Sequence, residues 1–185
     1  MRNRFERQLL ELNNELIQMG SMIERAIEMG ISALVRQDVE KAKKAIAYDE
    51  EIDEQEKTVE SLCMKLLLQQ QPVAKDLRLI SAALKMITDM ERIGDQASDI
   101  AEIIITEDKS EAQDIPMIIK MSEAASKMVR DSVNAYVEKD LDLARKVMEN
   151  DIMELILLHY DENEEDRAEL ALLKIKVCKV WKQSI

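Results

Sequence analysis

Residues 5–30 read FERQLLELNNELIQMGSMIERAIEMG, and this stretch decides the fold. Its apolar and small residues recur at alternating steps of four and three: Phe5, Leu9, Leu12, Leu16, Met19, Ile23, Ala26 and Gly30. Side chains at this spacing lie on one face of an α-helix, and a line that continues over about seven turns is typical of coiled-coil packing. We therefore predict a long helix that ends near Arg36 and buries this face against other helices.

The composition favours long helices throughout the chain. The 185 residues include only three Gly and two Pro, and aromatic residues make up 3%. Average usage of about 7% Gly and 5% Pro would give about thirteen and nine, so the turns that β-hairpins require are missing. The sequence predicts an all-α protein with an aliphatic core.

Two further helices complete a first bundle. Asp38 offers an N-cap oxygen to a second helix, which starts at Val39 and continues until Pro72 forbids its extension. Pro72 suits the first turn of a third helix. The apolar line expected on that helix is Leu77, Ile80, Leu84, Ile87, Ala101 and Ile105. Three long helices joined by tight turns predict an up-down-up bundle over residues 1–106.

The second part of the chain, residues 107–185, is predicted to form an incomplete second bundle. Thr106 to Pro116 is polar and reads as a linker. The helix that follows carries Met117, Met121, Ala124, Met128 and Ala135. Asp140 caps a fifth helix, which is expected to run from Leu141 to about His159. From about residue 151 the tail diverges from the rest of the chain.

An internal repeat relates the two parts. Six residues recur 102 positions later: Ala33, Val35, Asp38, Ala42, Lys44 and Asp49 return as Ala135, Val137, Asp140, Ala144, Lys146 and Asp151. Their constant register and shared turn indicate a duplicated unit, which is the pattern of tandem pseudo-symmetric three-helix bundles.

Charge and residue usage exclude several classes of protein. The net charge of -12 disfavours nucleic acid and anionic membrane as partners, although a local basic patch is compatible with it. The chain lacks an apolar run of about 18 residues, so we expect no direct membrane insertion. Cys63 and Cys178 show no metal-type spacing, and His159 is the single histidine. We expect a reduced, cytoplasmic protein that is not an enzyme and has no catalytic residue.

Acidic residues occupy positions where the helical pattern expects apolar ones. The line along the second helix runs through Ala42, Ala45, Asp49, Ile52, Glu56, Val59, Cys63 and Leu66, with Asp53 and Glu60 one turn from its two acids. In the third helix the line passes through Glu91, and Asp95, Asp99 and Glu102 follow at helical spacing.

Acids gathered in this way repel one another unless cations, protons or solvent compensate them. A cation shared between two helices is one solution. Oxygen ligands without His or Cys favour iron, manganese, magnesium or calcium over structural zinc. The other solution is a solvated acidic face, and the spacing alone leaves both open.

Three segments resemble the PhoU family of phosphate-signalling proteins. The segment ERIGDQASDIAE at residues 91–102 is similar to the signature of that family. YDEEID at 48–53 and QQPVAKDLRLI at 70–80 are similar to its second-helix acidic motif and to its entry into the third helix. With the repeat, the resemblance covers residues 1 to about 150.

The resemblance implies two pseudo-symmetric three-helix bundles that bind multinuclear metal clusters of iron or zinc. The ligands that it implies are Asp49, Asp53, Glu91, Asp95 and Asp99. Asp99 departs from the family pattern, in which Asn is common, but it keeps an oxygen ligand. Glu56 and Glu102 are expected beside the ligands or in solvent.

The resemblance further implies negative regulation of the phosphate-starvation response. The protein would act as an adaptor between the ATPase of a phosphate ABC transporter and a membrane sensor histidine kinase. A carboxylate-bridged di-iron or ferritin-like protein is the alternative function, but such sites carry Glu-x-x-His pairs, which are absent here. A purely structural coiled coil gives no reason for acids in the apolar line.

The second copy of the ERIGD motif would begin near position 193, beyond Ile185. We therefore expect a truncated or frame-shifted chain whose second bundle lacks its third helix. Without that helix the stripe of Met117, Met121 and Met128 needs another cover. Either the basic tail folds back over the stripe or a second chain covers it, and we expect a homodimer.

Overall fold

The computed structural model describes residues 2–70, 73–106 and 115–149. They form five α-helices: α1 (Arg2–Arg36), α2 (Val39–Gln70), α3 (Ala74–Thr106), α4 (Ile115–Glu138) and α5 (Leu141–Glu149). No strand occurs among these residues, so the predicted all-α class is confirmed. The expected continuation of the fifth helix to His159 and the divergent tail lie outside the described residues.

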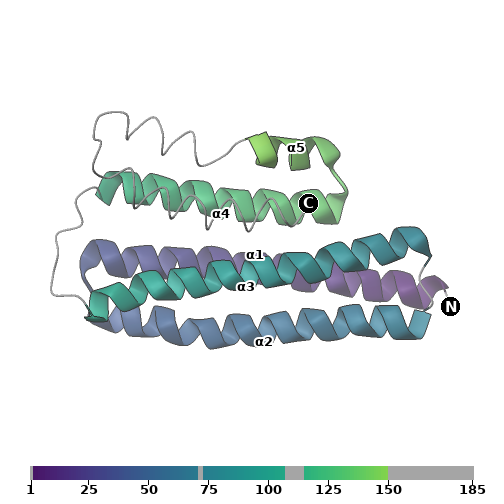
Figure 1. Ribbon diagram of the computed structural model, residues 1–185, viewed down its shortest axis with the longest axis horizontal. Coiled ribbons are helices and arrows are strands. Elements are labelled where there is room, and N and C mark those ends of the chain that lie inside the picture. Colours follow the sequence, from purple (N-terminus) through teal and green to yellow (C-terminus); the bar gives the residue numbers. More distant parts are fainter. Residues whose placement is uncertain (1, 71–72, 107–114, 150–185) are drawn as a thin grey trace.

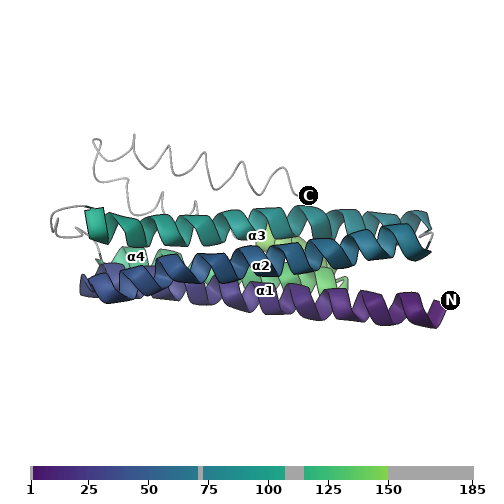
Figure 2. The same ribbon diagram turned by 90° about the horizontal axis from the view of Figure 1, so that it is seen from below.

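Helices α1, α2 and α3 form an antiparallel bundle and pack against one another (Figure 1). This is the predicted up-down-up arrangement. Helix α4 packs along α1, and the short α5 folds back on α4 (Figures 1 and 2). Helix α1 therefore belongs to the three-helix bundle and also packs against α4 of the α4–α5 hairpin.

The core is aliphatic and contains most of the apolar line predicted in the first helix. Leu12, Leu16, Met19 and Ile23 are fully buried, and Phe5 and Leu9 pack against them with part of their surface exposed. Helix α2 adds its own predicted line, whose fully buried members include Ile52, Val59, Cys63 and Leu66. Burial of one such side chain stabilises a fold by about 1.5–3 kcal/mol. The buried lines of α1 and α2 therefore contribute much of the free energy that holds the bundle together.

The apolar line predicted in the third helix was wrong at both ends. Leu77 and Ile105 are 49% and 43% exposed. The buried residues of α3 instead run through Ile80, Ala83, Ile87, Met90, Gly94, Ala97, Ala101 and Ile104. Ile105 lies one residue, about 100° around the helix, from this line, and Leu77 lies in the first turn at the end of the bundle.

The predicted repeat has a structural counterpart in two identical turns. Gln37 and Lys139 both have positive φ angles, 51° and 59°. In each case the next residue donates its backbone N–H to the carbonyl five positions earlier, at 3.1 Å for Asp38 and 2.9 Å for Asp140. This is the Schellman ending of a helix, formed here without glycine.

The same two aspartates begin the following helices. One carboxylate oxygen of Asp38 accepts the backbone N–H groups of residues 40 and 41, both at 3.1 Å. Asp140 accepts those of residues 142 and 143, both at 2.9 Å. Both predicted N-caps are confirmed, and the shared turn supports the duplication.

Two glycines allow the three long helices to approach closely. A Cβ atom on Gly30 of α1 would lie 2.6 Å from the backbone oxygen of Ala97 in α3. A Cβ atom on Gly94 of α3 would lie 3.0 Å from Cδ1 of Ile52 in α2. The first neighbour is backbone and cannot move alone, whereas the second is the end of a side chain.

We predict that Gly30→Ala destabilises the protein and that Gly94→Ala does so much less. Both changes gain the same helix propensity, about 1 kcal/mol, because both glycines are inside helices. Only Gly30→Ala forces α1 away from α3, for which overpacking costs of about 1–3 kcal/mol are usual. Urea unfolding followed by circular dichroism measures the difference, and equal midpoints for the two variants would contradict the prediction.

Candidate metal centre

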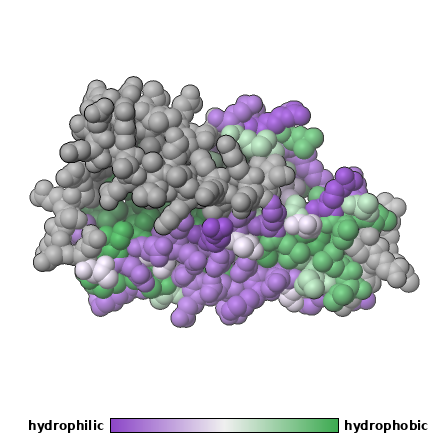
Figure 3. Space-filling model, in the orientation of Figure 1, coloured by the Kyte–Doolittle hydropathy of each residue, from purple (hydrophilic) through white to green (hydrophobic). Residues whose placement is uncertain are grey.

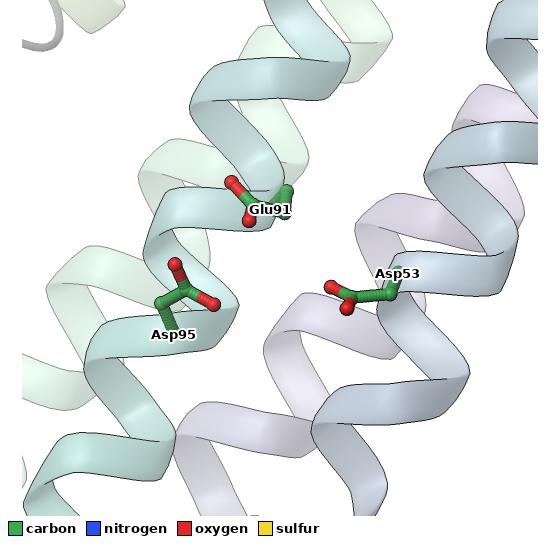
Figure 4. A group of neighbouring side chains, drawn as sticks. All are labelled: Asp53, Glu91 and Asp95. Atoms are coloured by element: carbon green, nitrogen blue, oxygen red, sulfur yellow. The ribbon is translucent and has the colours of Figure 1, made fainter.

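Acidic side chains from two helices face one another across the α2–α3 contact. Asp53 on α2 points towards Glu91 and Asp95 on α3 (Figure 4). One carboxylate oxygen from each of the three lies within 4.8 Å of the other two. The structure thus brings together three of the five acids predicted from the sequence.

The other two predicted acids lie at the edges of this group. Asp49 is one turn before Asp53, and its Oδ1 atom is buried without a hydrogen-bond partner. Asp99 is one turn after Asp95 and is exposed. Its charge nevertheless contributes to the raised pKa of Asp49, so Asp99 belongs to the same electrostatic group.

Helical spacing explains why these acids share one side of the bundle. Residues four apart lie above one another, so Asp49 and Asp53 form one row and Glu91, Asp95 and Asp99 form the other. Each row runs beside the buried line of its helix, at Ile52 in α2 and Gly94 in α3. Because Gly94 has no side chain, Ile52 packs directly on α3 and the two acidic rows come close.

The surroundings favour the neutral forms of two of these acids. Burial, followed by the charges of Asp95 and Glu56, raises the pKa of Glu91 to about 7. Burial, followed by the charge of Asp95, raises the pKa of Asp49 to about 6. In the described part of the chain, no Lys or Arg forms an ion pair with any of the five acids. Their repulsion is left for protons or a cation to relieve.

Glu56 lies at one end of the cluster, as expected for a residue beside the ligands. It is partly buried, and its charge contributes to the raised pKa of Glu91. Its Oε1 atom accepts a hydrogen bond of 3.3 Å from the Thr88 hydroxyl on α3. Thr88 was not predicted, although its position one turn before Glu91 could have revealed it. Glu102 is exposed, in line with the expected place in solvent.

The donor set fits a hard cation. Carboxylate oxygens are the ligands that calcium, magnesium, manganese and iron accept. A merely solvated acidic face would leave its oxygens in water, but Asp49 Oδ1 is buried and has no partner in the described structure. Such an oxygen is stabilised either by a proton or by a cation, and the arrangement can exchange one for the other.

Comparison with known proteins places this chain in a family. The family model described as the PhoU domain matches residues 16–104 and 118–172, which is most of the chain. The chain belongs to the PhoU family. The resemblance inferred from the ERIGD segment is therefore confirmed, and the matched residues include all five candidate ligands.

Curated PhoU relatives cover most of the chain. A phosphate-specific transport system accessory protein PhoU homolog from Clostridium acetobutylicum is 42% identical over 80% of this chain and 68% of its own length. One from Aquifex aeolicus is 36% identical over 85% of this chain and 72% of its own length. The crystal structure of PhoU from Pseudomonas aeruginosa has a TM-score of 0.70 and 27% identity, and the match covers 92% of this chain and 86% of that one.

We predict that the metal-free protein loses stability as the pH rises. The raised pKa values of Asp49 and Glu91, about 6 and 7, mean that the folded chain binds more protons than the unfolded chain above about pH 4. This stabilisation is complete below about pH 4 and is lost as the pH rises through 6 and 7.

The measurement is urea unfolding between pH 4 and pH 8 in the presence of a chelator. Asp49→Asn combined with Glu91→Gln keeps both positions neutral, so the free energy of unfolding of this variant should rise relative to wild type towards pH 8. A difference between the two proteins that stays constant with pH would show that these acids do not titrate in this range.

Proposed function

We propose that the protein is a negative regulator of the phosphate-starvation response and of phosphate uptake. It acts in the cytoplasm as an adaptor between the ATPase of a phosphate ABC transporter and a sensor histidine kinase. Membership of the PhoU family carries this proposal, because the curated relatives are named accessory proteins of phosphate-specific transport systems. No helix of the described residues is long and apolar enough to cross a membrane.

The names of the relatives favour an accessory role over catalysis. The cluster of Asp53, Glu91 and Asp95 offers only carboxylates. The ferritin-like alternative would use the same kind of acid, but the names of the relatives give it no support. We therefore propose that the acids serve regulation and that the protein is not an enzyme.

The proposal includes a multinuclear metal cluster, of iron or zinc, held by Asp49, Asp53, Glu91, Asp95 and Asp99. Three observations support it: the three oxygens within 4.8 Å, the buried unpartnered Asp49 Oδ1 and the raised pKa of Glu91. Bound cations would replace protons and relieve the repulsion between the acidic rows of α2 and α3. The metal would thereby hold the two helices together.

We predict that Asp49→Asn combined with Asp95→Asn abolishes stoichiometric metal binding and leaves the helical content intact. Both changes remove a charged ligand while keeping the size of the side chain. Elemental analysis of the purified protein measures the metal, and circular dichroism measures the helices. Glu50→Gln with Glu51→Gln is the matched control, since both glutamates are exposed on α2. Unchanged metal content in the first variant would refute the ligand assignment.

The regulatory role predicts a phenotype in phosphate-rich medium. Deletion of the gene should raise phosphatase expression there, because the sensor kinase would no longer receive the signal that phosphate is plentiful. A phosphatase assay on the deletion strain, with and without a plasmid that restores the gene, measures the effect. Expression that stays repressed in the deletion strain would exclude negative regulation by this chain.

A further inference from the structure

Four large aliphatic side chains are exposed at the end of the bundle where α2 passes into α3. Met64 and Leu68, one turn apart near the end of α2, are 44% and 77% exposed. Val73 immediately precedes α3 and is 65% exposed, and Leu77 in the first turn of α3 is 49% exposed. Hydrophobic surface gathers over this end of the molecule, on the right of Figure 3. Single exposed aliphatic residues are common, but four at one end form a surface that needs an explanation.

Basic side chains accompany these aliphatic residues. Lys65, Lys75 and Arg78 are exposed, and in the described parts of the chain none of them forms an ion pair. Arg4 and Arg7 are exposed in the first turns of α1, at the same end of the bundle (Figure 1). Glu6 and Asp76 also lie among these residues, so this end combines apolar groups with more cationic than acidic side chains in a protein of net charge -12. That combination suits an anionic partner with an apolar interior.

We propose that this end of the protein, the α2–α3 tip formed by Met64, Leu68, Val73 and Leu77 with Lys65, Lys75 and Arg78, docks on the surface of an anionic lipid bilayer. The aliphatic side chains enter the headgroup region, and the cationic groups pair with lipid phosphates. Weak burial and weak electrostatic attraction add to a reversible association, and each alone is insufficient. The proposal uses no residue of the acidic cluster, so it stands or falls separately from metal binding.

The acidic cluster lies too far from the tip to repel the lipid. Asp53 lies 15 residues before Leu68 on the same straight helix. At 1.5 Å per residue the two are about 22 Å apart along the helix axis. The screening length at physiological salt is about 8 Å, so the acidic cluster hardly contributes to the field at the tip.

The small apolar area of the tip favours a bilayer over a stable protein partner. Stable protein interfaces bury about 800 Å² on each partner. Four partly exposed aliphatic side chains at the end of two helices offer a smaller surface than this.

Flotation of the full 185-residue protein with lipid vesicles tests the proposal. The vesicles are pure phosphatidylcholine, or phosphatidylcholine with about 30% phosphatidylglycerol, at low and physiological salt. Wild type should float with the anionic vesicles and much less with the neutral ones. Leu68→Ser with Val73→Ser should weaken binding about tenfold or more, and Lys75→Glu with Arg78→Glu should remove the preference for anionic lipid.

A control variant distinguishes binding through the tip from nonspecific binding through any exposed aliphatic side chain. Ile17 on α1 is 43% exposed, close to the value for Met64, and lies away from the tip. Ile17→Ser should bind as wild type does. Circular dichroism must show the same helical content and melting temperature for every variant that is compared.

The proposal is overturned if wild type fails to float with anionic vesicles. It is also overturned if tip variants bind as well as wild type, or if Ile17→Ser weakens binding equally. Loss of phosphate regulation in the tip variants without any vesicle binding would assign the tip to a protein partner.

Discussion

The close packing of α3 against α1 and α2 decides which acids face one another, and it is closest at two helix positions that have no side chain. At Gly30 the backbones of α1 and α3 nearly touch, and at Gly94 the side chain of Ile52 fills the space that a Cβ atom would occupy. These contacts set the register between helices. The register in turn decides which acids of α2 meet which acids of α3.

Repulsion between the unpaired acids is large on the scale of a protein's net stability. Two unit charges about 5 Å apart repel by roughly 3 kcal/mol at an effective dielectric constant of about 20. Conformational entropy offsets most of the free energy gained from a buried core, so a domain is stable by only about 5–15 kcal/mol. Burial, followed by this repulsion, raises the pKa values of Glu91 and Asp49, and protonation of either acid relieves the repulsion.

Much of this arrangement could be predicted from the sequence because it depends on spacing within one helix. The buried face of α1, the N-caps at Asp38 and Asp140 and the two acidic rows all follow from helical periodicity. The selection of Asp53, Glu91 and Asp95 as the closest group could not be predicted, since it depends on the register between helices. The exposure of Leu77 could not be predicted either, because it depends on where the bundle ends. The hydrogen bond from Thr88 to Glu56 joins two helices, so it too depends on their register.

The position of α4 shows where the second copy of the repeat lies relative to the first bundle. Its turn with α5 copies the turn between α1 and α2, yet α4 does not extend the acidic face of α2 and α3. It lies on α1 instead, where Arg130 pairs with Glu24 and where Val133 packs against Gly20. The Tyr136 hydroxyl donates a hydrogen bond of 2.9 Å to the Leu79 carbonyl, which ties the end of α4 to the start of α3. Among the described residues, the α4–α5 hairpin is therefore connected to the helices of the acidic cluster through its packing on α1 and through this hydrogen bond near the start of α3.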